Sequence, residues 1–171
     1  MIRLNEAKLR ILGVDPGLAR TGWGLLSASG HQARVLDSGV ISSTSAVAFS
    51  DRLVRIYDQL RDIILKYKPD VVAVEDVIYV ENIRVALKLG HARGVILLLA
   101  AQQGLPVVGY APKEIKESLT GNGNASKLQM QRMVQSILAL KDMPSPHDVA
   151  DAIAVALCHF HRCTLESRLQ A

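Results

Sequence analysis

Four acidic residues stand where the surrounding sequence is apolar. Asp15 and Glu75 each follow a short apolar run typical of a buried strand, and Asp148 and Asp151 lie three residues apart in an alanine-rich stretch. Clustered carboxylates repel one another and raise each other's pKa, so a bare cluster calls for a cation. Mg²⁺ and Mn²⁺ prefer oxygen ligands, and a pair of such ions stabilises the attacking and leaving oxygens of a phosphoryl displacement. The pattern predicts a site in which all four carboxylates hold two Mg²⁺ or Mn²⁺ ions.

Three of these acids and the neighbouring His147 also have a purely structural interpretation. Asp148 follows Pro146 and His147, where it can serve as the N-cap of a helix. Asp151 can be a buried carboxylate that is satisfied by hydrogen bonds, and Glu75 can simply open a loop. His147 can orient water, transfer a proton or join the metal shell, or it can be a solvated loop residue. These alternatives stay open, although one metal site accounts for all four acids together.

Five basic residues and one tyrosine are candidates for contacts with a polyanion. The basic ones flank the loop 120–124 or lie on the helix expected after residue 82, and they are Lys116, Lys127, Arg84, Lys88 and Arg93. Lysines beside a flexible loop can contact phosphates, and Tyr79 can stack on a base. The alternative for each cation is a solvated charged face, and the alternative for Tyr79 is ordinary packing.

Composition favours one globular domain in a reducing compartment. The chain has 171 residues and a net charge of +4, which is a mild bias toward polyanionic partners. Cys158 and Cys163 are five residues apart, a poor spacing for a disulfide on one helix, so they are expected to be reduced and structural. The N-terminus does not resemble a signal peptide, and the apolar run 95–101 is too short to span a bilayer. We expect a cytoplasmic protein with no membrane contact.

The order of predicted elements indicates an α/β fold that can bring the acids together. Three strands joined by short turns predict an antiparallel meander, and the later alternation of strands and helices predicts parallel strands. The expected strands are 8–14, 22–27, 33–42, 71–74 and 107–110, and the expected helices are 51–67, 82–103, 112–119, 127–140 and 148–163. We therefore predict a mixed sheet with helices on both faces, in a single domain over residues 1–171 with a loose leader at 1–9.

Small residues recur in two places. Gly22 and Gly24 follow Asp15, and we expect them, with Gly17, to leave open space beside that carboxylate. The long helix after residue 82 carries small residues four apart on one face, namely Ala86, Gly90 and Gly94. This spacing permits close approach of another backbone, either within the domain or across a dimer interface.

Several of these motifs together resemble the RuvC-type Holliday-junction resolvases. They are Gly13-Val14-Asp15-Pro16-Gly17 with Thr21-Gly22-Trp23-Gly24, then Ala73-Val74-Glu75-Asp76-Val77, then Ala86 to Gly94, and finally Asp148 to Ala154. Their order and spacing match over nearly the whole chain. The Leu-Lys-Leu-Gly-His-Ala-Arg-Gly block makes the resemblance specific. One departure is Ile78, where the family often has an aromatic side chain; Tyr79 follows it.

The resemblance implies a ribonuclease H-like fold and a homodimer that nicks four-way DNA junctions symmetrically by attack of a metal-activated water. It assigns the metal-holding, catalytic role to Asp15, Glu75, Asp148 and Asp151, and it places Lys116 and Lys127 near the scissile phosphate. It also makes the helix from Asn82 the dimer helix, and RuvA and RuvB the partners. A rival hypothesis is a non-catalytic protein that binds junctions or structured RNA. A second rival, a sugar kinase-like ATPase, needs a further nucleotide-binding domain for which 171 residues leave no room.

Overall fold

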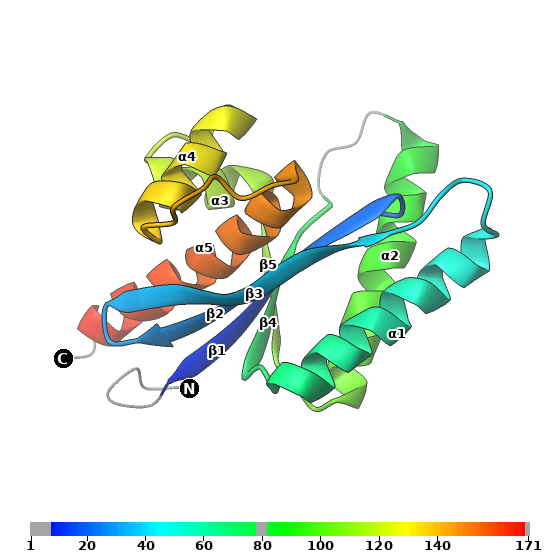
Figure 1. Ribbon diagram of the computed structural model, residues 1–171, viewed down its shortest axis with the longest axis horizontal. Coiled ribbons are helices and arrows are strands. Elements are labelled where there is room, and N and C mark those ends of the chain that lie inside the picture. Colours follow the sequence, from blue (N-terminus) through cyan, green and yellow to red (C-terminus); the bar gives the residue numbers. More distant parts are fainter. Residues whose placement is uncertain (1–7, 78–81, 170–171) are drawn as a thin grey trace.

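The computed structural model describes residues 8–77 and 82–169, so Ile78, Tyr79 and most of the leader lie outside it. Strands and helices alternate much as the sequence predicts (Figure 1). The elements are β1 (Leu9–Asp15), β2 (Arg20–Ser29), β3 (Gln32–Ser42), α1 (Phe49–Tyr67), β4 (Val71–Glu75), α2 (Ile83–Gln102), β5 (Val107–Tyr110), α3 (Pro112–Thr120), α4 (Lys127–Ile137) and α5 (His147–Leu169). Within the described ranges, no helix is long and apolar enough to cross a membrane.

β1 lies in the middle of a five-stranded sheet with the order β3-β2-β1-β4-β5. β2 runs antiparallel to β1 and β3, whereas β4 runs parallel to β1 and β5. The predicted mixed sheet is therefore confirmed. Val14 pairs with Val74 in the β1–β4 register, so the residues that follow, Asp15 and Glu75, end side by side at one edge of the sheet.

Helices cover both faces of the sheet, as predicted (Figure 1). α1 and α2 enclose one apolar core, and α5, with α3 and α4 against it, encloses the other. Leu12 and Val14 belong to the α1–α2 core, and Ile11 belongs to the α5 core. Because strand side chains alternate between faces, Asp15 faces α5, and the same alternation in β4 turns Glu75 to that side.

Two helices end differently from the prediction. α4 stops at Ile137 rather than at residue 140, because Ala139 adopts a left-handed backbone with φ of 48°. α5 begins at His147 and runs to Leu169, beyond the predicted end at residue 163. Its last turns are exposed and carry an Arg162–Glu166 pair at 3.0 Å, in the i,i+4 spacing that supports a solvated helix.

The glycines around Asp15 do not leave open space, so that expectation is wrong. A Cβ atom on Gly22 would lie 1.9 Å from the carbonyl oxygen of Asp148, and one on Gly24 would lie 2.6 Å from an α5 side chain. A Cβ on Gly17 would meet the carbonyl oxygen of Arg20 at 2.0 Å within the β1–β2 turn. The glycines instead let the backbone of α5 lie directly against β2, which brings the first turn of α5 to Asp15.

Candidate active site

Asp15 and Glu75 form the sheet half of a carboxylate cluster. Both are half-buried at the ends of neighbouring parallel strands. Burial raises the pKa of Asp15 to about 8, and repulsion from Glu75, Asp151 and Asp148 adds to the shift. Burial also raises the pKa of Glu75 to about 7, with Asp151 adding to it. Both carboxyls thus hold a proton far more readily than an exposed acid does, because burial and the neighbouring carboxylates outweigh the nearby positive charge.

The first two turns of α5 supply the helix half. Asp148 and Asp151 are three residues apart and therefore share a helix face. Burial raises the pKa of Asp151, while Lys127 opposes the shift and Asp148 adds to it. α5 begins at His147, so Asp148 lies inside the first turn and not at the N-cap. Its carboxylate instead lies 3.6 Å from a guanidinium nitrogen of Arg20. The alternative in which Asp148 mainly caps the helix is therefore wrong.

The chemistry of this donor set fits a hard divalent cation. The four carboxylates act on one another electrostatically, and they offer the oxygen ligands that Mg²⁺ and Mn²⁺ prefer. They are not a ready-made coordination sphere: within residues 8–77 and 82–169, no three His, Cys, Asp or Glu side chains converge closely enough to hold a metal ion. A cation would relieve the mutual repulsion that adds to the effect of burial on these pKa values.

Two lysines stand beside the cluster from the α3–α4 side. Lys127 lowers the pKa of Asp15, Glu75 and Asp151, and Lys116 lowers that of the last two. Lys127 is the first residue of α4, whose start is fixed by a capping box between Ser126 and Gln129. Lys116 and Lys127 therefore lie within electrostatic reach of the carboxylates.

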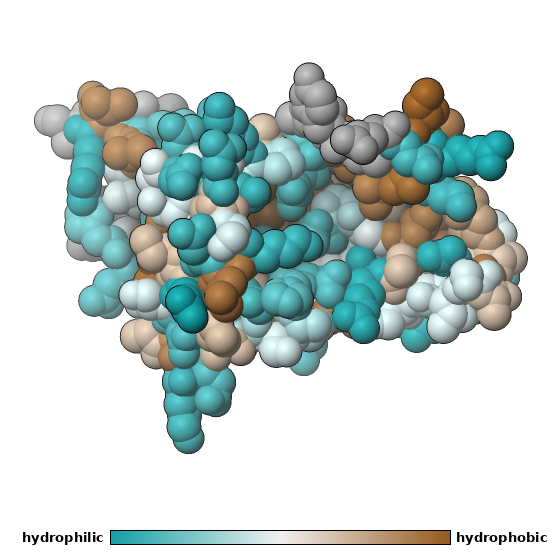
Figure 2. All heavy atoms as spheres, turned by 90° about the horizontal axis from the view of Figure 1, so that it is seen from above, coloured by the Kyte–Doolittle hydropathy of each residue, from teal (hydrophilic) through white to brown (hydrophobic). Residues whose placement is uncertain are grey.

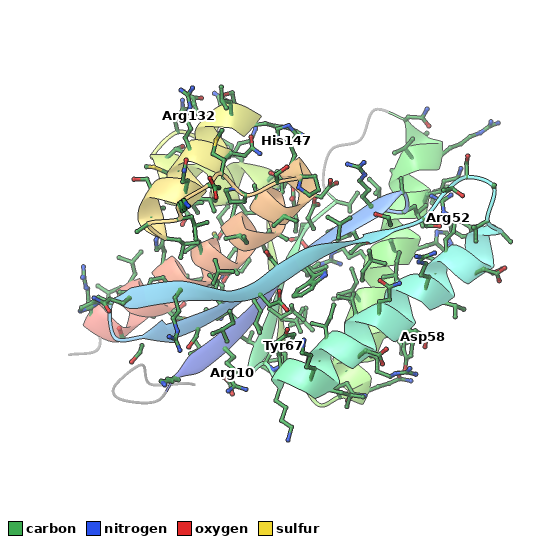
Figure 3. The ribbon with its side chains drawn as sticks, in the orientation of Figure 1. Arg10, Arg52, Asp58, Tyr67, Arg132 and His147 are labelled. Carbon is green, nitrogen blue, oxygen red and sulfur yellow. The ribbon has the colours of Figure 1, made fainter. Side chains whose placement is uncertain are left out.

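Figure 2 shows the molecule from above the view of Figure 1, and hydrophilic side chains cover much of the middle of this face, between apolar patches on either side. His147 is exposed at the start of α5 (Figure 3), and its proximity lowers the pKa of Asp151. It therefore lies within electrostatic reach of the cluster.

The predicted cations of α2 differ in their surroundings. Arg84 and Lys88 are exposed in its first two turns. Arg93 is half-buried and forms a 2.5 Å ion pair with Asp76, the residue after Glu75. That pair ties α2 to the segment leaving β4, so Arg93 has a structural role whatever else it contacts. Tyr79 lies outside the described residues.

An open apolar groove runs along the outer face of α2. Its volume is about 670 Å³, and its floor includes Gly90 and Gly94. A Cβ atom on either glycine would meet nothing within 4 Å. Large side chains flank the floor, and Leu87 and Leu98 remain 60% and 56% exposed. Packing within the domain, one of the two interpretations of this spacing, is therefore wrong for Gly90 and Gly94.

Residues 11–159 match the model of the family described as crossover junction endodeoxyribonuclease RuvC. The chain belongs to this family. The RuvC family resemblance drawn from the motifs is thereby confirmed, and so is the enzyme class that the family name states.

RuvC relatives match the chain over nearly its whole length. The crossover junction endodeoxyribonuclease RuvC of Caldicellulosiruptor saccharolyticus is 46% identical over 88% of this chain and 92% of its own. The RuvC of Pelotomaculum thermopropionicum is 45% identical over 94% of this chain and 98% of its own. Among solved structures, T. thermophilus RuvC in complex with Holliday junction substrate has a TM-score of 0.87 at 32% identity, covering 93% of this chain and 97% of that one. The predicted ribonuclease H-like fold is confirmed by this match.

The main feature of the candidate site that the sequence did not indicate is the positive charge next to Asp148. Arg20 is the first residue of β2, just after the turn that follows Asp15, and neither its spacing nor its neighbours single it out. Arg52 comes from α1, where it looks like one more polar residue of an amphipathic helix. Both line a hollow beside Asp148. They meet there only because three separate elements converge.

Proposed function

We propose that this chain is a structure-specific endonuclease that resolves four-way DNA junctions by paired, symmetric nicks in recombination and repair. The observation that carries the proposal is the cluster of four half-buried acids from β1, β4 and α5, in a chain of the RuvC family. The similarity to T. thermophilus RuvC in complex with Holliday junction substrate supports this choice of DNA.

The proposed reaction is hydrolysis of one phosphodiester per site. Water attacks phosphorus, the bond to the 3′ oxygen breaks, and the products are a 5′-phosphate and a 3′-hydroxyl that a ligase can seal. Asp15, Glu75, Asp148 and Asp151 would hold two Mg²⁺ ions, with Mn²⁺ as a substitute. Bound divalent ions polarise the phosphodiester and lower the pKa of the attacking water. His147 accepts or relays the proton at the open edge of the site.

The basic residues around the acids bind and orient the DNA backbone. Lys116 and Lys127 hold the scissile phosphate in place against the carboxylates, and their charges partly offset the raised pKa values of Glu75 and Asp151. Arg84 and Lys88 contact the backbone from α2, and Arg93 and Tyr79 stay predicted contacts. These electrostatic contacts make binding fall with rising salt.

The assembly we propose is a homodimer with one site in each subunit. The α2 groove supports it, because exposed leucines around a glycine floor fit the same helix of a second copy. Two sites related by a two-fold axis match the symmetry of paired nicks. RuvA and RuvB are the proposed partners, the cytoplasm is the proposed location, and residues 1–171 are proposed to form one domain.

A synthetic four-way junction tests the function. Incubation with Mg²⁺ should give paired nicks at symmetric positions, mapped on denaturing gels with each strand labelled in turn. Asp15→Asn, which keeps the shape and removes the charge, should abolish nicking while junction binding persists. The matched control is Asp62→Asn on α1, whose side chain is 70% exposed and lies outside the cluster. Junction binding without any nicking across Mg²⁺ and Mn²⁺ would instead support the rival, a non-catalytic junction or structured-RNA binding protein.

A further inference from the structure

A second charged hollow adjoins the carboxylate cluster on its α1–α2 side. Its volume is about 420 Å³, and it lies between the β1–β2 turn, the first turn of α1 and the second turn of α2. Three of the side chains that line it are positive, namely Arg20, Arg52 and Lys88, and the single acid is Asp148. The hollow therefore carries an excess of positive charge and shares one wall with the candidate active site.

Arg52 is the least satisfied of these cations. Its Nε atom is buried and has no hydrogen-bond partner among the described residues. Within residues 8–77 and 82–169, no carboxylate lies within 4.0 Å of its guanidinium, nor within 4.0 Å of the ammonium of Lys88. A buried donor without a partner costs free energy, which an anion in the hollow would recover. Arg52 is labelled in Figure 3, at the start of α1 beside α2.

Arg20 connects the hollow to the acids. Its guanidinium lies 3.6 Å from the carboxylate of Asp148, yet its side chain stays 59% exposed. It can therefore pair with Asp148 and still donate to an anion in the hollow, because a guanidinium carries five donors. The carboxylate cluster consequently has positive charge on two sides: the lysines of α3 and α4 on one, and the cations of this hollow on the other.

We propose that Arg20, Arg52 and Lys88 bind a backbone phosphate of the cleaved strand, next to the phosphate that is cut. The proposal rests on the proposed function. A DNA strand whose scissile phosphate lies over the four acids must continue beyond the carboxylate cluster on some side. On the side of Asp148 this hollow offers cations to the next phosphate of the strand. The planar guanidinium of Arg52 matches two phosphate oxygens at once, and Lys88 adds a point charge. Anchoring the neighbouring phosphate fixes the register of the strand over the acids.

Binding measurements without cleavage test the hollow separately from catalysis. A labelled four-way junction is titrated in EDTA with wild type, Arg52→Ala, Lys88→Ala and the control Arg61→Ala. Arg61 lies on the same helix as Arg52, pairs with Asp58 at 3.2 Å and does not line the hollow. Each hollow variant should weaken binding about tenfold and flatten the salt dependence by about one phosphate contact, whereas Arg61→Ala should do neither. Arg20 is left unchanged because it also pairs with Asp148.

A scan of single methylphosphonate linkages locates the contact. Neutralising one linkage beside the cut site should weaken wild-type binding, and that loss should disappear in Arg52→Ala because the contact is already gone. The proposal is overturned if the binding losses from the methylphosphonate linkage and from Arg52→Ala simply add at every position. It is also overturned if the hollow variants bind the junction as well as Arg61→Ala does. Lys88 is exposed, so its variant stays folded even if Arg52→Ala does not. Millimolar inorganic phosphate should raise the melting temperature little; strong stabilisation that Arg52→Ala removes would indicate a free-phosphate site and overturn the DNA contact.

These results separate this inference from the proposed function. Wild-type protein that nicks junctions while the hollow variants bind normally overturns the phosphate contact alone. Wild-type protein that neither prefers junctions nor nicks them overturns both.

Discussion

Glycines serve opposite purposes in two regions of this protein. On β1 and β2 they face α5, and a Cβ on Gly22 would lie 1.9 Å from the backbone of Asp148. On α2 they face outward, and a Cβ on Gly90 or Gly94 would meet nothing within 4 Å. The first set lets one element of the domain lie close to another, while the second leaves a groove for something outside it. The same residue type therefore brings α5 against the candidate active site in one place and leaves an open groove in the other.

The largest loss of stability is expected from a substitution of a glycine that faces α5. Gly22→Ala should destabilise the protein by about 3 kcal/mol, because the obstacle is helix backbone and cannot rotate away as a side chain can. It should also reduce nicking by more than the loss of folded protein explains, since any shift of α5 moves Asp148 and Asp151 from Asp15. Urea unfolding and nicking rates corrected for the folded fraction measure the two effects. Unchanged stability would show that α5 does not lie as close to β2 as the structure has it.

A substitution in the α2 groove should weaken dimerisation and hardly change the stability of the monomer. Leu98→Glu places a charge on an apolar face whose leucine is already 56% exposed, so the monomer loses little. The proposed dimer should weaken about a hundredfold, because the charge would be buried in its interface without a partner. Sedimentation over a concentration series measures this, with Leu128→Glu on α4, 46% exposed and outside the groove, as the matched control. If both variants self-associate as strongly as wild type does, α2 is not part of the interface.

The packing of α5 against β2 buries Asp15, and this burial predicts that stability without metal falls as the pH rises. The folded pKa of Asp15 is about 8, above its ordinary value of 3.8, so the folded state binds a proton that the unfolded state has released. Stability should fall as pH rises from about 5 to 8, by up to about 1 kcal/mol per pH unit for such a group. Asp15→Asn should flatten this slope, and Mg²⁺ should reverse it. Melting temperatures in EDTA and in Mg²⁺ across this range measure it, and a wild-type slope identical to that of Asp15→Asn would contradict it.

The sequence could predict the two strand-end acids because apolar runs and alternation are local signals. It could also place Asp151, where a charge interrupts an apolar helix. It could not tell the two glycine sets apart, since whether a glycine faces a helix or solvent depends on which elements pack together. The pairing of Arg20 with Asp148 and the meeting of Arg20, Arg52 and Lys88 were hidden for the same reason. Each depends on contacts between residues distant in the chain, which periodicity does not encode.

The smallest predicted effect has the opposite sign from the first. Gly90→Ala, made in the Leu98→Glu background so that monomers are compared, should raise the free energy of unfolding by about 0.5–1 kcal/mol. Gly90 lies inside α2 with ordinary helical geometry and open space around it, so alanine relieves the entropic cost of glycine without a clash. Urea unfolding measures it. In the wild-type background the same change should weaken the dimer, because the added methyl group fills the floor of the groove. A loss of monomer stability would mean that the glycine packs within the domain, and the contrast with Gly22 would disappear.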